Sequence, residues 1–232
     1  FNQNLIQKTY DSSFKVIATS TALKKSITKR FKVNESKMML VPNPVNEDIF
    51  TLRPPLKNKR ISLTSVGLFR PEKNFDLIIK AFDKVLKSGI DANLNIVGDG
   101  PLCNQIKKQI NLLQKPNRVK LWGYLGPDQI VEVLHKTDIF IMGSSIETFG
   151  VSLIEAQACG IPSVSTKCGG PNDIILKDTG VLVQPNSEFY LHKGIIKAIK
   201  KTNFYDFENI RKKTVKRFGK NIYCKRIKKI LD

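Results

Sequence analysis

Short apolar segments alternate with segments of helical periodicity along the centre of the chain. Residues 61–67 form a short run of apolar and β-branched side chains, which predicts a buried strand. In the next segment apolar side chains recur at i, i+3, i+4 and i+7, so we predict a helix with one buried face that ends before Gly89. The side chains on that face are Phe75, Ile78, Ile79, Phe82, Val85 and Leu86.

The same alternation continues toward the end of the chain. Five further strands are predicted, at residues 94–97, 119–122, 138–142, 162–165 and 180–183. Helices are predicted between them: one running through Gln114, then 127–135 and 150–159, a short one from Pro171, and helices over the rest. Short apolar strands separated by helices predict an α/β fold, a doubly wound, Rossmann-like parallel sheet with helices on both faces.

The two ends of the chain carry a weaker pattern of the same kind. Residues 1–50 predict a helix, a strand at 15–18, a helix after Thr21 and a strand at 37–41. The last helix is predicted to carry one apolar face, made of Tyr223, Ile227, Ile230 and Leu231.

Composition restricts the class of protein. With 232 residues, 41% of them hydrophobic, the chain can bury a substantial core. No apolar run is long enough to span a bilayer, and no signal peptide is visible, although the missing initial Met suggests a trimmed sequence. The four cysteines lack metal-ligand spacing and do not suggest a disulfide framework, so we expect no metal and a cytoplasmic setting.

The formal net charge of +19 lies entirely at the two ends. Residues 1–60 carry +8, residues 61–192 carry no net charge, and residues 193–232 carry +11. A solvated basic surface is one interpretation. The sharper one is peripheral contact with an anionic membrane, at its inner face, because polybasic segments are attracted there. We expect no nucleic-acid partner, since the ends lack interleaved aromatic residues and recognisable modules.

Polar and glycine-rich segments follow one predicted strand after another. Ligands of doubly wound sheets bind at the carboxyl ends of the strands. The segments that come directly after the strands are Arg70 with Lys73, residues 98–101, Gly123 with Tyr124, residues 144–150 and residues 169–171. We therefore expect them to meet at one edge of the sheet. Residues 98–101 lack the full three-glycine spacing of a dinucleotide loop, so we predict a tight turn there.

Two glutamates carry the most specific signal in the chain. Glu147 precedes the predicted start of a helix, and Glu155 lies within that helix. The residues between them, Phe149 to Val151, would offer free backbone N–H groups, which attract phosphate. Two carboxylates beside an anion-binding turn are suited to a ligand that carries both hydroxyls and phosphates.

These residues resemble the carboxyl-terminal, donor-binding domain of the retaining family-four (group 1) glycosyltransferases, which have the GT-B fold. The matching segments run in order over most of the chain: residues 41–43, 66–73, 97–101, 122–125, the E-x7-E signature from Glu147 to Glu155 with its continuation to Pro162, residues 169–171 and residues 180–183. Seven ordered matches are a specific signal, whereas a lone E-x7-E would be weak. The resemblance implies a remnant of an amino-terminal domain at residues 1–50, a donor-binding domain at 51–218 and a terminal crossover helix at 219–232.

The resemblance also implies roles for the cations. Lys73 would neutralise the diphosphate of the donor and stabilise it as a leaving group, and Arg70 would assist. The family commonly places its Arg directly after the glycine, where this chain has Leu68; in extended chain an offset of two keeps the same face. The alternative for Arg70 is a surface cation beside Glu72 and Asp76.

For the remaining site residues the resemblance implies contacts with the donor. Glu147 would accept hydrogen bonds from the sugar and Glu155 from the ribose, while Phe149, Gly150 and Val151 would offer N–H groups. The alternatives are an N-terminal helix-dipole carboxylate for Glu147 and a capped or paired buried carboxylate for Glu155.

Other donor-site positions come from the neighbouring loops. The resemblance also implies that Gly67 and Thr148 belong to the donor site. Leu121, Gly123 and Tyr124 would border the nucleobase, with Tyr124 as a stacking ring or, alternatively, a core or rim aromatic.

The implied reaction is transfer of a sugar from a nucleoside-diphosphate sugar to an acceptor hydroxyl with retention of anomeric configuration, without a metal or other cofactor. UDP is the favoured nucleotide, and a saccharide or lipid-linked acceptor in polysaccharide or glycolipid synthesis is expected. Because most of the acceptor side belongs to the amino-terminal domain, we expect this chain alone to be inactive. Two alternatives remain open: another GT-B enzyme, such as a sugar-nucleotide epimerase or a phosphorylase, or a non-catalytic basic binding module.

Overall fold

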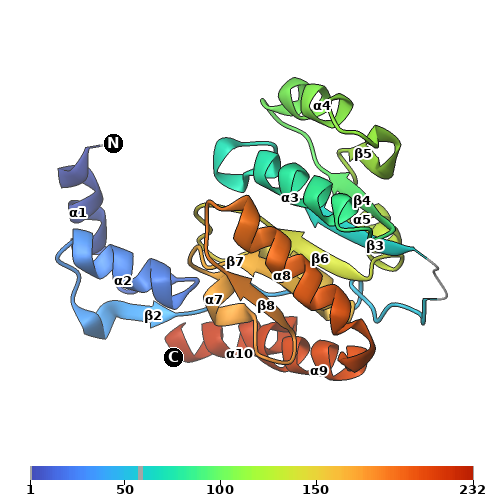
Figure 1. Cartoon of the computed structure of the whole chain (residues 1–232). Helices are drawn as coiled ribbons and strands as arrows, with labels where there is room; N and C mark the ends of the chain where they lie inside the picture. Colours follow the sequence, from blue (N-terminus) through green and yellow to red (C-terminus); the bar gives the residue numbers. More distant parts are fainter. Residues whose placement is uncertain (1, 57–59, 232) are drawn as a thin grey trace.

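Six parallel strands form the main sheet of the computed structural model, which describes residues 2–56 and 60–231 (Figure 1). The strands are β3 (Ile61–Val66), β4 (Ala92–Val97), β5 (Val119–Gly123), β6 (Ile139–Met142), β7 (Ser163–Thr166) and β8 (Gly180–Val183). Their order is β5-β4-β3-β6-β7-β8, so the chain winds outward in one direction from β3 and in the other from β6. The predicted doubly wound fold is confirmed, and its topological switch point lies between β3 and β6.

Helices pack on both faces of this sheet, and the central strand β6 alternates its side chains between two cores. Leu63 and Ile139 belong to one core, together with α3 (Phe75–Lys87), α4 (Cys103–Asn111) and α8 (Glu188–Lys200). Phe140 and Met142 belong to the other, together with α5 (Pro127–Leu134), α6 (Val151–Ala158), α7 (Pro171–Ile174) and the end of α9 (Phe207–Phe218). In Figure 1, α3 and α8 lie on the near side of the sheet.

The predicted helices are present, with one boundary to correct. Helix α3 buries seven apolar side chains and ends before Gly89, which has a φ of 82°. Helix α4, predicted to run through Gln114, ends at Asn111. The residue before a proline is disfavoured in the helical region, and Lys115, which precedes Pro116, has φ −130° and ψ 67°.

A smaller unit precedes the main sheet. Helix α1 (Gln3–Ser12) and helix α2 (Thr21–Arg30) pack beside a two-stranded parallel sheet of β1 (Val16–Ala18) and β2 (Met38–Leu40). The segment that follows β2 returns to the main body, where the Arg211 guanidinium donates to the carbonyls of Glu47, Phe50 and Ala158 at 2.9, 2.5 and 2.6 Å. One half-buried arginine therefore fixes the path of the chain between the two sheets.

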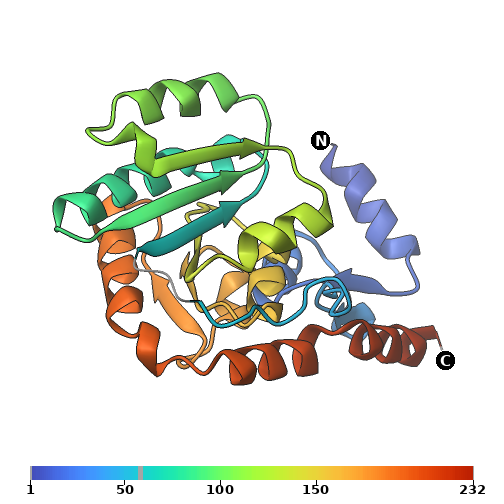
Figure 2. The same cartoon turned by 90° about the vertical axis from the view of Figure 1, so that its right-hand side faces the viewer.

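The terminal helix α10 (Lys220–Leu231) follows Gly219 and lies near the small unit in both Figure 1 and Figure 2. Ile230, on the predicted apolar face, is buried. Leu231 is 77% exposed, although helical geometry places it one turn after Ile227 on the same face. The surface that covers Ile230 therefore does not extend over the last residue of the helix.

The loops that follow β3 and β4 are packed together without space for a side chain. The N–H of Phe69 donates to the carbonyl of Asp99 at 2.8 Å. Gly98 has a φ of 142°, and a Cβ at this position would lie 1.9 Å from the carbonyl oxygen of Gly67. The turn predicted at residues 98–101 thus forms the support of the loop that carries Arg70 and Lys73.

We expect Gly98→Ala to destabilise the protein by about 3 kcal/mol or more, because the methyl group overlaps backbone atoms and the φ is strained as well. Gly89→Ala is the matched control: its φ of 82° is also positive, but nothing lies within 4 Å of the added Cβ. That control should cost about 1 kcal/mol. Urea denaturation measures both, and equal losses would show that the close contact is not what requires glycine.

Candidate functional site

An ion pair joins the loops that leave the two central strands. Lys73 ends the short 3-10 helix after β3, and Glu147 lies in the loop after β6. The Nζ of Lys73 lies 2.5 Å from Oε2 of Glu147, and the two side chains are 27% and 10% exposed. A backbone hydrogen bond of 2.8 Å from Ser145 to Glu72 holds the same two loops together. The pair therefore stands at the carboxyl ends of β3 and β6, beside the switch point.

The loop after β7 fixes the backbone of Glu147 from the other side. The N–H of Glu147 donates to the carbonyl of Cys168 at 2.9 Å, and its own carbonyl accepts from the N–H of Gly170 at 2.8 Å. A Cβ at Gly170 would lie 2.1 Å from the carbonyl oxygen of Phe149. The segment at residues 169–171 thus acts as a support for the glutamate loop, which explains why two glycines stand there.

The turn between the two glutamates leaves backbone donors unused. Gly150, with a φ of 112°, precedes α6, which begins at Val151. Among the described residues, the N–H groups of Phe149, Gly150 and Val151 have no acceptor. The Phe149 ring is buried and packs edge-on against Phe218, with 5.6 Å between ring centroids. A buried aromatic anchor thus holds three free donors at the start of a helix, where anions are favoured.

Glu155 lies in the second turn of α6 and is largely shielded from solvent. Burial raises the pKa of its carboxyl group to about 7. Within the described part of the chain no group forms a hydrogen bond or an ion pair with this carboxyl group. The alternative of a paired buried carboxylate is therefore wrong for Glu155. A buried carboxylate without a partner is costly, so a ligand or a proton is needed to satisfy it.

Arg70 is exposed at the beginning of the loop that carries Lys73. Leu68 is exposed as well, while Phe69 between them is fully buried. Leu68 and Arg70 are thus both exposed and the residue between them is buried, as expected for two positions on the same side of an extended segment. The alternative partner Asp76 instead forms an ion pair of 2.8 Å with Lys80. Arg70 has no ion-pair partner in residues 2–56 and 60–231.

The residues expected to border a nucleobase lie at the carboxyl end of β5. Leu121 is half-buried in the strand, and Gly123 ends it with a φ of 74°. Tyr124 is 78% exposed, which excludes a core aromatic and leaves its ring on the surface beside the strand end. Gly67 lies next to Lys73, whose Cδ would be 3.9 Å from an added Cβ.

Sequence analysis missed the contact of the small unit with this edge. Both the N–H and the hydroxyl of Thr21 donate to the carboxylate of Asp173, each at 2.6 Å. The hydroxyl of Thr19 donates to the carbonyl of Thr148 at 3.4 Å. Thr21 and Asp173 are 152 residues apart in the chain, so no local pattern could have predicted the pair.

Two larger hollows, of about 600 and 630 Å³, lie at the amino ends of the strands rather than beside Lys73 and Glu147. Over residues 2–56 and 60–231 no group of His, Cys, Asp and Glu side chains is arranged to hold a metal ion. In the same residues we find no helix with the length and apolar character needed to cross a bilayer.

The raised pKa of Glu155 predicts that its replacement stabilises the protein more at high pH. The native carboxyl keeps its proton until about pH 7, whereas the unfolded one releases it near 4.5. Between these values the native state binds more protons, so wild-type stability falls as pH rises. We expect the stability of Glu155→Gln relative to wild type to rise from pH 4.5 to 8 by up to about 3 kcal/mol.

Urea denaturation at several pH values measures this difference. The control is Glu132→Gln, at an exposed glutamate on α5. A difference between Glu155→Gln and wild type that does not change with pH would contradict the burial of this carboxyl.

Similarity to known proteins agrees with this geometry. The chain matches the family described as "Glycosyl transferases group 1" over residues 48–223. N-acetyl-alpha-D-glucosaminyl L-malate synthase from Bacillus anthracis is 32% identical over 190 residues, which cover 78% of this chain and 49% of that protein. The phosphatidylinositol N-acetylglucosaminyltransferase GPI3 subunit of Saccharomyces cerevisiae (strain S288c) is 28% identical over 192 residues, covering 80% and 42%. The chain thus spans about half the length of these relatives, or less.

Solved structures share the fold at lower identity. The lipopolysaccharide outer core galactosyltransferase WaaB in its apo form superimposes with a TM-score of 0.81 at 24% identity, covering 94% of this chain and 62% of that one. HepE from Anabaena, solved with UDP and glucose, has a TM-score of 0.85 at 19% identity, covering 100% and 67%. With its six-stranded doubly wound sheet and its family match over most of its length, the chain belongs to the group 1 glycosyltransferases of GT-B fold.

Proposed function

We propose that the chain is the donor-binding part of a retaining, metal-independent glycosyltransferase that transfers a sugar from a nucleoside-diphosphate sugar to an acceptor hydroxyl. The observation that carries this proposal is the Lys73–Glu147 pair at the switch point of the sheet, where doubly wound folds bind ligands. It places a cation for the diphosphate next to a carboxylate for the sugar.

The diphosphate is held by charge and by backbone donors. Lys73 and Arg70 supply the cations, and the free N–H groups at Phe149 to Val151 point from the start of α6. These groups stabilise the negative charge that develops on the diphosphate as the bond to the sugar breaks. No metal is needed in this arrangement. Because Lys73 is paired with Glu147, donor binding replaces one anionic partner of Lys73 by another rather than placing a charge beside an unneutralised cation.

The sugar and the nucleoside bind on either side of the diphosphate. Glu147 accepts hydrogen bonds from the sugar hydroxyls and so fixes the reacting carbon, with Thr148 beside it. Glu155 accepts from the ribose hydroxyls, which supply the partner that its buried carboxyl lacks. Leu121, Gly123 and the exposed ring of Tyr124 border the base. UDP is the favoured nucleotide, supported by the UDP complex of HepE.

The acceptor is a saccharide or a lipid-linked molecule. The names of the relatives include enzymes acting on malate and on phosphatidylinositol, so they do not agree on one acceptor. Since those relatives are about twice as long as the chain, we propose that the acceptor is bound largely outside it. A polysaccharide or glycolipid product is consistent with the WaaB similarity, which concerns the fold.

Calorimetric titration with UDP tests the donor site directly. We expect wild type to bind UDP more tightly than GDP or ADP, and Glu155→Gln to weaken UDP binding about tenfold, because the ribose hydroxyls lose a charged acceptor. Absence of binding by all three nucleotides would overturn the proposal. A basic binding module would instead bind all three nucleotides equally, and its affinity for them would not change in Glu155→Gln.

Glu147→Gln separates the sugar from the nucleotide in the same titration. It frees Lys73 from its ion pair, so UDP should bind as tightly as to wild type or more tightly. It should also abolish any gain in affinity from UDP to UDP-glucose. An epimerase or a phosphorylase is distinguished by products: the former converts the UDP-sugar without an acceptor, and the latter requires inorganic phosphate.

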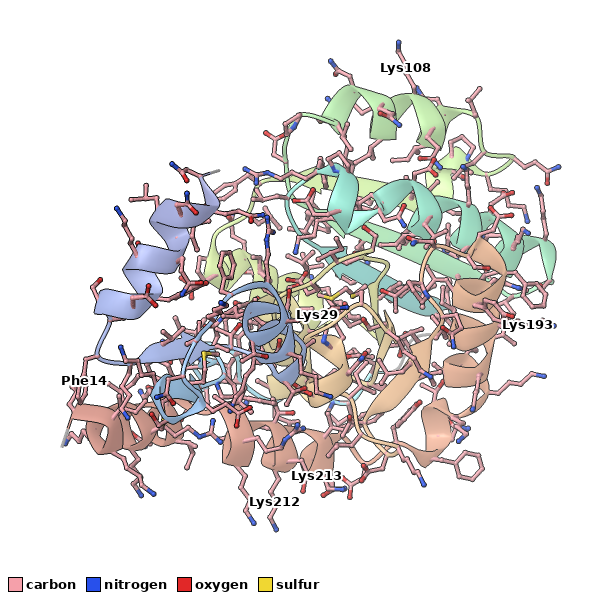
Figure 3. The ribbon with its side chains drawn as sticks, turned by 90° about the vertical axis from the view of Figure 1, so that its left-hand side faces the viewer. Phe14, Lys29, Lys108, Lys193, Lys212 and Lys213 are labelled. Carbon is pink, nitrogen blue, oxygen red and sulfur yellow. The ribbon has the colours of Figure 1, made fainter. Side chains whose placement is uncertain are left out.

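We also propose that the basic ends make peripheral contact with an anionic membrane. Lysines are exposed along α9 and α10, and Figure 3 shows Lys212 and Lys213 extending outward from α9. Two exposed apolar side chains accompany these lysines: Phe14, 75% exposed, which Figure 3 shows on the side of the small unit, and Leu231, 77% exposed, at the end of α10. Cations beside exposed apolar side chains favour the interface of an anionic bilayer.

Replacing Lys225, Lys228 and Lys229 together by Gln should weaken binding to vesicles of anionic phospholipid at least tenfold, since each lysine contributes roughly 1 kcal/mol. The control replaces Lys107, Lys108 and Lys115 by Gln; Figure 3 shows Lys108 at the opposite end of the molecule from Lys212. Cosedimentation measures the affinity. Equal losses in both variants would mean that charge alone, without a defined face, attracts the membrane.

A further inference from the structure

One face of β4 and β5 is polar, which is unusual for an all-parallel sheet. Such sheets are normally apolar on both faces because helices cover both. In β4, Asn93 and Asn95 alternate with fully buried apolar residues, and in β5 Lys120 and Trp122 are exposed. Strict alternation is the pattern of strands with one open face. In Figure 2, β3, β4 and β5 face the viewer with no helix in front of β4 and β5.

A hollow of about 600 Å³ lies on this open face. Its lining combines amide, hydroxyl and cationic groups, from Arg60, Ser62, Asp91, Asn93, Asn95, Asn117, Arg118, Lys120 and Lys136. A second hollow of about 130 Å³, beside Trp122 and Leu125, shares Asn95 and Lys136 with the first. Because they share these two side chains, the hollows are adjacent, and we call them together the β4–β5 groove.

The polar side chains in the groove are held in fixed positions. The indole N–H of Trp122 donates to Oδ1 of Asn95 at 3.0 Å, and the amide of Asn95 donates to the hydroxyl of Ser62 at 3.2 Å. The ammonium group of Lys120 lies 3.2 Å from the centroid of the Trp122 ring. Hydrogen-bonded side chains of this kind offer a pre-organised surface, which lowers the entropic cost of binding.

The groove carries an excess of positive charge. Asp91 accepts from Arg60 at 2.9 Å and lies 2.8 Å from Arg118, so its charge is already neutralised. These arginines lower the pKa of the Asp91 carboxyl. Among the described residues, neither Lys120 nor Lys136 has an acidic partner within ion-pair distance. One further carboxylate, Glu132, lines the smaller hollow. Four cations thus face two carboxylates, and the groove favours an anion.

We propose that the β4–β5 groove binds an anionic oligosaccharide, one whose sugars carry carboxylate or phosphate groups. The amides of Asn93 and Asn117 can pair with sugar hydroxyls, because an asparagine amide offers two donors and one acceptor oxygen. The lysines bind the charged substituents of the sugars, and the ring of Trp122, which lies under the ammonium group of Lys120, holds that cation in the groove.

Two other occupants fit the groove less well. Single-stranded nucleic acid stacks on a series of aromatic rings, whereas this groove has one. A protein interface has an apolar centre, whereas this one is lined by amides and charges. The groove lies on a face of the sheet, apart from Lys73 and Glu147, so the proposal does not depend on the donor site.

The test titrates the full chain with three probes: an oligogalacturonate of six sugars, uncharged maltohexaose, and inorganic tripolyphosphate. We expect the oligogalacturonate to bind most tightly, since it alone offers both hydroxyls and carboxylates on sugar rings. Equal binding of maltohexaose would overturn the need for charge. Equal binding of tripolyphosphate would overturn the proposal that the groove recognises a saccharide, and would show that it is a nonspecific basic patch.

A pair of matched variants locates the binding site. Lys120→Gln with Lys136→Gln should weaken oligogalacturonate binding about fivefold. Lys212→Gln with Lys216→Gln, which removes the same charge from α9, should leave it unchanged. Asn117→Ala, at an exposed amide, should weaken the oligogalacturonate and leave tripolyphosphate unchanged. Equal losses in the two lysine pairs would overturn the groove as the site, and thermal midpoints close to wild type would show that the variants are folded.

Discussion

The ion pair of Lys73 and Glu147 is the contact on which the geometry of the candidate site depends. It joins the loop after β3 to the loop after β6, the two central strands from which the chain winds in opposite directions. The pair is mostly shielded from water. A partly buried pair is sensitive to the loss of either member, because the remaining charge is left without a partner. The position of each side chain therefore depends on the other, and a ligand that binds to one of them also affects its ion-pair partner.

Backbone contacts at glycine surround this pair on both sides. Gly98 lies against the loop before Lys73, and Gly170 lies against the loop that carries Glu147. In each case a side chain would overlap backbone oxygen. The rim of the sheet is thus assembled from loops that support one another laterally, β4 supporting β3 and β7 supporting β6. Chemistry-bearing side chains stand on the inner loops, and the outer loops hold them in place.

The fold was predictable from sequence because its signals are local. The strands of the main sheet are short segments that contain apolar or β-branched side chains, and α3 shows its buried face at helical spacing. Two details were harder to predict. Helix α4 ends early because of Pro116, and Leu231 is exposed because the surface that covers Ile230 does not extend over it. The site was predictable as an edge of the sheet, since parallel strands bring their ends together.

Pairings across the chain were not predictable in the same way. The contact of Lys73 with Glu147 joins residues 74 positions apart, and neither the short distance nor the absence of a partner for Glu155 has a sequence signal. The open face of β4 and β5 did have a sequence signal, which is the alternation of asparagines with apolar residues in β4. That signal could be interpreted only once it was known which helices cover which strands.

The contact between Thr21 and Asp173 has a mechanical consequence. Any rotation that separates the small unit from the main sheet must first break two hydrogen bonds to one carboxylate, so Asp173 resists that separation.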